Sequence, residues 1–289
     1  MIRVLKFIPK AIASFLPHIL YLWMLHFLSQ RNERPVSWSV LERNRELKNR
    51  HLGERCFVLG NGPSVRAVDL SRLKGETIIS VSNGYLHRDY SEIRPKYHCV
   101  PQTHPPMTDD DVARWFGEMD AELGSATLFL NETENQLVCS RKLFERRDVR
   151  YLDMRADFDQ LSDRQILDLT KPIPRVQSVP VMVLIVAMYL GFKEIYLLGV
   201  DHDHFINGTY EYAFELKAQR GKDDSVSSNG EIVISRYDDF QSLARLWRQY
   251  RVLREIAAKN DVKIFNATPG GVLDEFQRVD LDAVLTGWR

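Results

Sequence analysis

Short apolar runs that end in polar or glycine-rich residues recur along this chain. Residues 56–59 and 195–200 are continuous hydrophobic runs, and 262–271 reads as a strand followed by a glycine-rich turn. Strands buried in the centre of a parallel sheet have such continuous runs, and ligands of open α/β sheets bind beyond the carboxyl ends of the strands. The pattern predicts a Rossmann-like α/β fold, with a mostly parallel sheet, flanking helices and a site in the turns after these strands.

The remaining elements follow from hydrophobic periodicity and turn residues. The segment 179–190 is apolar on nearly all sides, which is typical of a buried helix. Ser178 can cap its start, and Gly191 can end it in a left-handed conformation. The long polar segment 205–235 is expected to form a lid. Further strands are predicted at 77–81, 97–100, 126–130 and 149–152, and further helices at 38–49, 68–73, 109–123 and 241–258.

The turn after the first strand reads Gly60-Asn61-Gly62-Pro63-Ser64. The glycines can take positive φ and let a ligand approach the backbone closely, and Pro63 suits the first position of a helix. The amides of such a turn can bind phosphate or carboxylate. An ordinary strand-to-helix turn is the alternative, because the segment lacks the full dinucleotide and P-loop patterns.

The strand 195–200 runs into Asp201-His202-Asp203-His204. Two carboxylates spaced in this way can hold Mg²⁺ or Mn²⁺, which in turn would hold a diphosphate. Alternatively, Asp201 accepts hydrogen bonds from loop amides. Zinc fits less well, because neighbouring residues of a strand point to opposite faces. No cofactor is firmly implied, and Mg²⁺ or Mn²⁺, held by Asp201 and Asp203, stays open.

Charge and hydrophobicity divide the chain into a leader, residues 1–50, and a catalytic domain, residues 51–289. Residues 1–51 hold nine Lys/Arg and three Glu, a net charge of +6, and the whole chain is neutral, so the remainder carries −6. The apolar stretch 11–28 suits an interfacial helix at an anionic membrane surface. A membrane span and packing against protein are the alternatives. This distribution argues against a nucleic-acid partner.

The cysteines are three, dispersed and odd in number, which argues against a disulfide framework. Cys56 and Cys99 lie in predicted strands and are expected in the core. A reducing compartment fits this usage. Together with the leader, it favours a peripheral location at the cytoplasmic face of a membrane.

Several of these segments together resemble a known family. Gly60-Asn-Gly-Pro-Ser64, Asn83, Arg175-x-x-Ser178, the segment 190–201 and Tyr212-Ala-Phe214 are similar to motifs of bacterial sialyltransferases of glycosyltransferase family 42 and of the wider MptE-like group. The likeness extends over most of the catalytic domain. It implies that Asn61 and Asn83 contact CMP, that Arg175 and Ser178 line the donor site, and that Tyr212 steadies the leaving phosphate. The same resemblance places Gly60, Gly62, Ser64 and Asp201 in the nucleotide site.

The chain departs from the family pattern at the catalytic base. The sialyltransferases carry a histidine before the last long helix, whereas the corresponding segment 232–239 contains none. A general base must reach the acceptor hydroxyl. We therefore expect His204, His202 or Asp239 to take this role.

These features favour a glycosyltransferase of bacterial surface polysaccharide or lipopolysaccharide assembly. Its expected partners are a nucleotide-sugar donor, CMP-activated and acidic, and a glycan or lipid-linked acceptor. A homo-oligomer stays open. The alternatives are a Mg-ATP-dependent pyrophosphokinase of a hydroxymethylpterin, which is the activity of an archaeal MptE-like protein, and a non-catalytic nucleotide-binding or scaffold protein.

Overall fold

The computed structural model describes residues 38–103, 106–158, 165–207, 212–214 and 235–287. The described residues belong to a single compact unit. The predicted leader helix at 11–28 and most of the predicted lid lie outside the described residues. Within the described part of the chain, no helix has both the length and the apolarity that crossing a bilayer demands.

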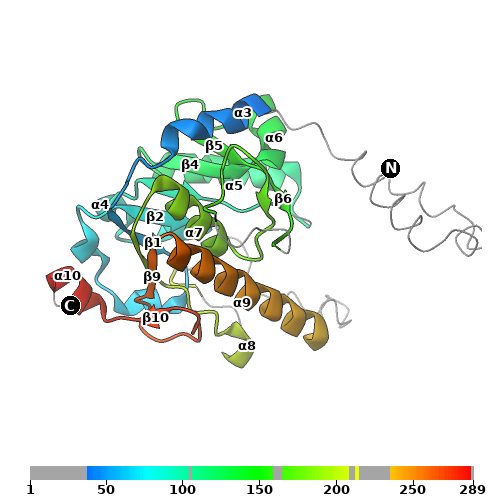
Figure 1. Cartoon of the computed structure of the whole chain (residues 1–289). Helices are drawn as coiled ribbons and strands as arrows, with labels where there is room; N and C mark the ends of the chain where they lie inside the picture. The colour runs from blue at the N-terminus through cyan, green and yellow to red at the C-terminus, as the bar shows by residue number, and fades with distance from the viewer. Residues whose placement is uncertain (1–37, 104–105, 159–164, 208–211, 215–234, 288–289) are drawn as a thin grey trace, which may run out of the picture. The chain divides into compact units, whose positions relative to one another are not determined.

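An eight-stranded sheet, parallel at every pairing, forms the centre of the fold (Figure 1). Its spatial order is β10-β9-β8-β1-β2-β3-β4-β5, so the chain builds outward from β1 and later returns to add β8 on the other side of β1. Such a reversal is the switch point at which open α/β sheets bind ligands. The bounds are β1 Arg55–Leu59, β2 Ile78–Val81, β3 Tyr97–Cys99, β4 Thr127–Asn131, β5 Val149–Leu152, β8 Glu194–Leu198, β9 Lys263–Asn266 and β10 Gln277–Arg278. The predicted α/β class with a parallel sheet is confirmed.

Two short strands, β6 (Met154–Ala156) and β7 (Ile173–Pro174), form a separate parallel pair that the sequence analysis did not predict. Helices flank the large sheet. Their bounds are α3 Trp38–Glu42, α4 Tyr90–Ile93, α5 Asp109–Glu122, α6 Asn135–Ser140, α7 Val179–Leu190, α8 His204–Asn207, α9 Arg236–Lys259 and α10 Leu281–Thr286.

Hydrophobic cores on both faces of the sheet explain the continuous apolar runs. In β1, Cys56 and Val58 belong to the core that contains α7 and part of α9, whereas Phe57 and Leu59 belong to the opposite core. Helices α7 and α9 pack together, and α7 also contacts β1, β2 and β3 (Figure 1). Helix α7 matches its predicted bounds, and Gly191 ends it with a φ of 94°. Cys56 and Cys99 are buried, as expected.

Two predicted helices are different in the structure. The segment 68–73 is not an α-helix, because the side chain of Asp69 accepts the amide of Ser71 and starts a 3₁₀ helix over Leu70–Leu73. The segment 38–49 is a short α3 followed by a 3₁₀ helix over Arg43–Leu47. Leu41, Asn44 and Leu47 are all fully buried, and 3₁₀ winding places residues at this spacing of three on one face.

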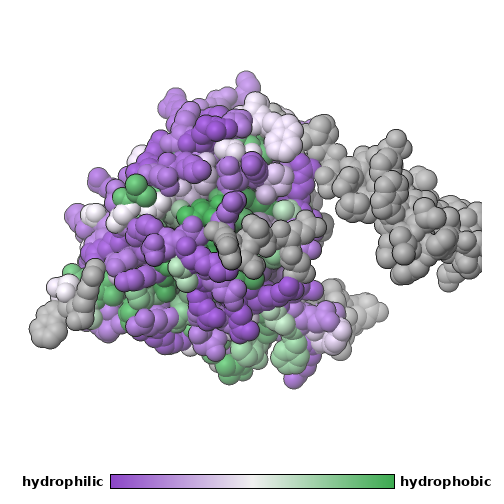
Figure 2. All heavy atoms as spheres, in the orientation of Figure 1, coloured by the Kyte–Doolittle hydropathy of each residue, from purple (hydrophilic) through white to green (hydrophobic). Residues whose placement is uncertain are grey.

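The surface seen in Figure 2 is mostly hydrophilic, with hydrophobic side chains at the position of α8. Phe205 and Ile206 of this helix are exposed by 40% and 64%. They follow His204 directly in the chain. An apolar surface therefore lies beside one of the predicted site residues.

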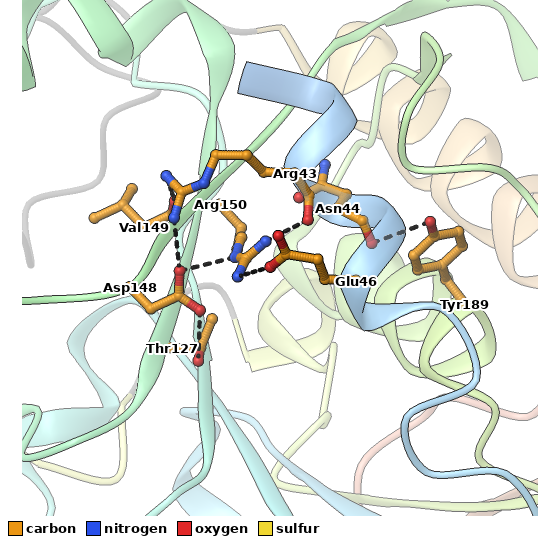
Figure 3. A network of polar contacts seen from close by, with 8 residues as sticks. All are labelled: Arg43, Asn44, Glu46, Thr127, Asp148, Val149, Arg150 and Tyr189. Atoms are coloured by element: carbon orange, nitrogen blue, oxygen red, sulfur yellow. Dashed lines mark hydrogen bonds and ion pairs between the residues drawn. The ribbon is translucent and has the colours of Figure 1, made fainter. Parts of the chain in front are cut away.

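Residues 38–50 were assigned to the leader, but they pack against the α/β body. The Asn44 side-chain amide donates to the carbonyls of Tyr151 and Leu169, both at 2.8 Å. The Tyr189 hydroxyl of α7 donates to the Asn44 carbonyl at 3.1 Å (Figure 3). This buried side chain therefore joins the segment to β5 and to the loop before β7.

Charged residues reinforce the same contact. Arg150 of β5 is 5% exposed and forms ion pairs with Glu46 at 3.0 Å and with Asp148 at 2.8 Å (Figure 3). Arg43 pairs with the same Asp148 at 3.1 Å. A buried guanidinium is stable only when it is paired in this way.

We expect Asn44→Ala to lower the free energy of unfolding by about 2–4 kcal/mol, because two buried carbonyls lose their donor. Chemical denaturation measures the change. The neighbouring Arg45→Ala is the matched control, because the Arg45 side chain is 71% exposed and pairs with Glu42; its stability should stay close to wild type. Equal stability of the two variants would contradict the anchoring role of Asn44.

Candidate functional site

A cavity of about 550 Å³ lies beyond the carboxyl ends of β1, β2 and β8, at the switch point of the sheet. This volume falls within the range of small-molecule sites. The structure brings most of the predicted site residues together there. Those that line the cavity are Gly60, Asn61, Gly62, Asn83, Ser178, Asp201, His202, Asp203, His204 and Tyr212. Ser64, Arg175 and Asp239 do not line it.

The glycines of the first turn are needed for close packing rather than for positive φ. Although both glycines can take positive φ, Gly62 has a φ of −67° and Gly60 also lies outside that region. A Cβ atom at Gly60 would lie 2.3 Å from the carbonyl oxygen of Gly199, and one at Gly62 would lie 1.8 Å from Asp201 Oδ2. The turn after β1 therefore packs directly against the turn after β8.

Asp201 connects three turns of the site. It is 5% exposed and accepts hydrogen bonds from the Ser64 hydroxyl at 2.8 Å and the Ser64 amide at 3.3 Å. Its carbonyl accepts the amide of Val272, in the turn after β9, at 2.8 Å. Burial raises the pKa of Asp201, and the bonds from Ser64 act in the opposite direction. This is the arrangement of the alternative interpretation, in which Asp201 binds loop groups.

The two carboxylates that were predicted to hold a metal ion, Asp201 and Asp203, both line the cavity. Asp203 lines the cavity near Asp201, and its charge contributes to the raised pKa of Asp201. Among the residues that the structure describes, no group of three or more His, Cys, Asp or Glu side chains is arranged to hold a metal ion. A cation bound by Asp201 and Asp203 would therefore take its other ligands from substrate and water.

The two predicted asparagines present their side chains differently. Asn61 donates through Nδ2 to the carbonyl of Val81 at 3.2 Å, and its buried Oδ1 has no protein donor. Asn83 accepts through Oδ1 from the indole N–H of Trp115 at 2.7 Å. Trp115, on α5, also lines the cavity. Sequence reasoning missed it, because an aromatic residue in an amphipathic helix carries no signal that separates a site from a core.

A buried histidine holds the backbone beside Asn83. Ser82 has a φ of 45°, which is unusual for a non-glycine residue. His98 Nε2 donates to the Ser82 carbonyl at 2.9 Å, so its Nδ1 accepts from the Ser80 hydroxyl at 2.7 Å. Burial lowers the pKa of His98 to about 3, so the ring is neutral near pH 7. The hydrogen bond from the buried His98 therefore fixes the backbone of the turn that carries Asn83.

The start of α7 forms another wall of the cavity. Ser178 occupies the N-cap position, but its side chain makes no capping hydrogen bond, so the predicted side-chain cap is wrong. Its backbone is extended, and the residue lines the cavity with Val179 and Pro180. No Lys or Arg occurs among the described lining residues. The positive end of the α7 dipole lies at this wall and favours an anion there.

The histidines after β8 have different surroundings. His202 has a φ of 53°, and its Nε2 lies 2.7 Å from the Tyr250 hydroxyl of α9. Burial lowers its pKa to about 4. Burial also lowers the pKa of His204, whereas the charges of Asp239 and Asp203 raise it. Asp203 lines the cavity with His204, whereas Asp239 does not line it and acts on His204 through its charge.

Two further predicted residues lie at the border of the site. Arg175 is exposed. Its backbone amide donates to the Ala156 carbonyl, and its backbone carbonyl accepts from Gln249 Nε2, both at 3.0 Å. The segment that begins at Tyr212 is attached to the first turn, because the amide of Ala213 donates to the Asn61 carbonyl at 2.9 Å. The Arg66 guanidinium donates to the Tyr212 carbonyl.

No protein-family model matches the chain, and no curated protein sequence matches it significantly. Solved structures do resemble it. The MAf glycosyltransferase of Magnetospirillum magneticum AMB-1 is 18% identical over 92% of this chain, with a TM-score of 0.45. The match covers 43% of the Magnetospirillum protein, so this chain corresponds to less than half of that protein's length.

The other similar structures are sialyltransferases. The Campylobacter jejuni sialyltransferase CstII in complex with a substrate analogue, CMP, is 18% identical, with a TM-score of 0.42, over 79% of this chain and 85% of that one. The sialyltransferase CST-II with a trisaccharide acceptor and CMP is 17% identical, with a TM-score of 0.45, over 78% and 85% of the two chains. These sialyltransferases are of the class of enzyme whose motifs the sequence resembles. At these identities the likeness concerns the fold alone.

We expect Gly62→Ala to lower the free energy of unfolding by about 3 kcal/mol, because the added methyl group would overlap Asp201 and displace it from Ser64. Thermal and urea unfolding measure the change. Gly117→Ala on α5 is the matched control, since a Cβ there has no atom within 4 Å. It should leave stability unchanged or raise it by up to about 1 kcal/mol. A Gly62→Ala protein as stable as this control would refute the close-packing interpretation.

Proposed function

We propose that the protein is a glycosyltransferase that uses a nucleotide-activated sugar, namely a CMP-activated acidic sugar. The observation that carries the proposal is the cavity of about 550 Å³ at the switch point of the parallel sheet. Its walls include Asn61, Asn83 and Ser178, the positions at which the sequence resembles the donor-binding motifs of sialyltransferases. Amides and a hydroxyl at such a site suit the base, ribose and phosphate of a nucleotide.

In the proposed reaction, the bond between the anomeric carbon and the phosphate oxygen breaks, and CMP leaves with the bonding electrons. Hydrogen-bond donors and positive charge must stabilise the leaving phosphate. We assign this role to the N-terminus of α7 and the Ser178 hydroxyl, because Ser178 is the N-cap of this helix and lines the cavity. Arg175, three residues earlier and exposed, is proposed as the guanidinium that binds the phosphate of the bound donor.

The acceptor oxygen then bonds to the anomeric carbon, and its proton passes to a base. We assign this role to His204. It lines the cavity, and burial lowers its pKa, which keeps the imidazole neutral near pH 7. Asp239 and Asp203 would stabilise the imidazolium that forms. His202 is less suited, because its Nε2 already pairs with the Tyr250 hydroxyl.

The acceptor is proposed to be a glycan or a lipid-linked sugar at the cytoplasmic face of a bacterial inner membrane. Two features support this location: the net charge of +6 in residues 1–51 and the exposed side chains of Phe205 and Ile206. Because these two residues follow His204, an amphipathic acceptor could bind them while its hydroxyl reaches the base. Surface-polysaccharide assembly would supply such an acceptor.

A second candidate is the Mg-ATP-dependent pyrophosphokinase. One observation favours it: Asp201 and Asp203 line the cavity, whereas no Lys or Arg is found among the described lining residues. A polyphosphate in such surroundings would be stabilised by a divalent cation. The pairing of Asp201 with Ser64 weighs against it, because that carboxylate already has hydrogen-bond donors.

A binding screen with CMP, CDP, UDP, GDP and ATP, each in EDTA and in Mg²⁺, separates the candidates. We expect CMP to bind in EDTA, and Asn61→Ala and Arg175→Ala each to weaken binding by about 1–3 kcal/mol through lost bonds to a charged ligand. Thermal shift and calorimetry measure the affinities. The surface variant Arg245→Ala, on α9, should bind as wild type does.

Other outcomes of the screen are equally informative. Selective ATP binding that needs Mg²⁺ and is lost in Asp203→Ala would replace the transferase by the pyrophosphokinase. CMP binding without release of CMP from a CMP-activated sugar would favour the non-catalytic alternative. If no nucleotide binds, both enzymatic proposals are wrong.

The rate of CMP release from a CMP-activated acidic sugar should fall by about 10²–10⁴ in His204→Ala. In wild type the rate should rise with pH through the lowered pKa of His204 and level off above it. Asp239→Asn removes a charge that raises this pKa, so the acidic limb should move to lower pH. Asp238→Asn, at the exposed neighbouring position, should leave the limb in place. An unshifted limb in Asp239→Asn would exclude the His204–Asp239 pair as the base.

A further inference from the structure

We infer that Trp115 is a positioning residue that fixes the Asn83 amide, so that position 83 offers only hydrogen-bond donors to the cavity and selects ligands with an acceptor atom there. The nature of the ligand, a nucleotide, rests on the proposed function; the orientation of the amide does not. The inference follows from the side chains around Asn83.

The polarity of the contact is set by the chemistry of the two side chains. Trp115 Nε1 lies 2.7 Å from Asn83 Oδ1, and both residues line the cavity. An indole N–H can only donate, whereas the two ends of an asparagine amide are an acceptor and a donor. The amide therefore turns its oxygen to Trp115 and its NH₂ group away from it.

The donor side of this contact is held by a firmly packed helix. Val112, Phe116 and Met119 of α5 are buried, and Phe116 packs against Phe144. Thr108 and Asp111 form a capping box at the start of the helix. A side chain on such a helix loses little conformational entropy when it makes a hydrogen bond.

The Asn83 backbone is fixed as well. It follows Ser82, whose φ is 45° and whose carbonyl accepts from His98 at 2.9 Å. His98 is fully buried and paired with Ser80. Both ends of Asn83 are therefore constrained before any ligand binds, which is the preorganisation that increases affinity and selectivity.

The other asparagine of the cavity cannot take over this role. The Asn61 NH₂ group is directed at the Val81 carbonyl, at 3.2 Å. The Asn61 Oδ1 atom lies close to Gly84: a Cβ atom added there would be 3.2 Å from this oxygen. The backbone at Gly84 therefore limits the space beside the oxygen. Of the two asparagines among the described lining residues, Asn83 is thus the one that turns its NH₂ group away from its protein partner.

Trp115→Phe keeps an aromatic ring but removes the N–H, so the Asn83 amide can rotate and offer its oxygen to the ligand. We expect CMP affinity to fall about 3- to 10-fold, the effect of one neutral hydrogen bond. The test is a double-mutant cycle with Trp115→Phe, Asn83→Ala and the double variant, with CMP affinity measured by calorimetry. In the Asn83→Ala background, Trp115→Phe should have no further effect. Additive losses would overturn the inference.

Trp247→Phe is the matched control, because its indole N–H also donates to a side chain, Asp274, at 2.8 Å. It should leave CMP affinity unchanged. Unfolding curves of all variants show whether a loss of affinity reflects a loss of folded protein. If Trp115 has only a structural role, Trp115→Phe should lower stability, and it should lower CMP affinity by the same factor in wild type as in Asn83→Ala.

A ligand-free measurement separates this inference from the proposed function. The indole N–H resonance of Trp115, identified by its loss in Trp115→Phe, should move upfield in Asn83→Ala and stay in place in Asn61→Ala. If the resonance moves but wild type binds no nucleotide, the proposed function fails and the fixed amide stands. If wild type binds CMP but the resonance does not move, the fixed amide is wrong.

Discussion

The close contact between the turns after β1 and β8 determines the geometry of the site. Gly60 and Gly62 allow the first turn to pack against Gly199 and Asp201, and the buried carboxylate of Asp201 then accepts the donors of Ser64. These turns belong to strands that are adjacent in space but more than a hundred residues apart in sequence. Because both turns also line the cavity, any change in their packing alters the walls that would contact a ligand.

The sheet and the longest helices were predictable because burial leaves a clear pattern. Each central strand is covered on both faces, which requires a continuous apolar run, and α7 is apolar on all sides for the same reason. The 3₁₀ helix at 43–47 was not predictable, since Asn44 bonds to Tyr151, a residue far along the chain that local propensity does not reveal. The 3₁₀ helix at 70–73 was misjudged for another reason: Asp69 accepts the amide of Ser71 two residues on, a local bond that competes with the α-helix that the apolar spacing predicted.

The candidate site was predictable to a similar extent. Residues that follow strands, such as Asn61, Asn83 and His204, meet at the cavity because parallel strands end at one edge. The contact of Gly62 with Asp201 was not predicted, because it joins residues far apart in the sequence. Trp115 was missed for the same reason: its bond to Asn83 joins a helix to a turn 32 residues away. Conversely, Ser64 bonds within the protein and does not line the cavity.

The packing of residues 38–50 also has a consequence for solubility. β5 is the edge strand of the large sheet, and an open edge can pair with a strand of another molecule. Arg43 and Asn44 donate to the carbonyls of Val149 and Tyr151, two alternate groups of this strand. Side chains from a preceding segment thus occupy acceptors that an incoming strand would need. A fragment that begins at residue 51 would keep every strand of the sheet but would expose the unpaired backbone groups of β5, which promote aggregation.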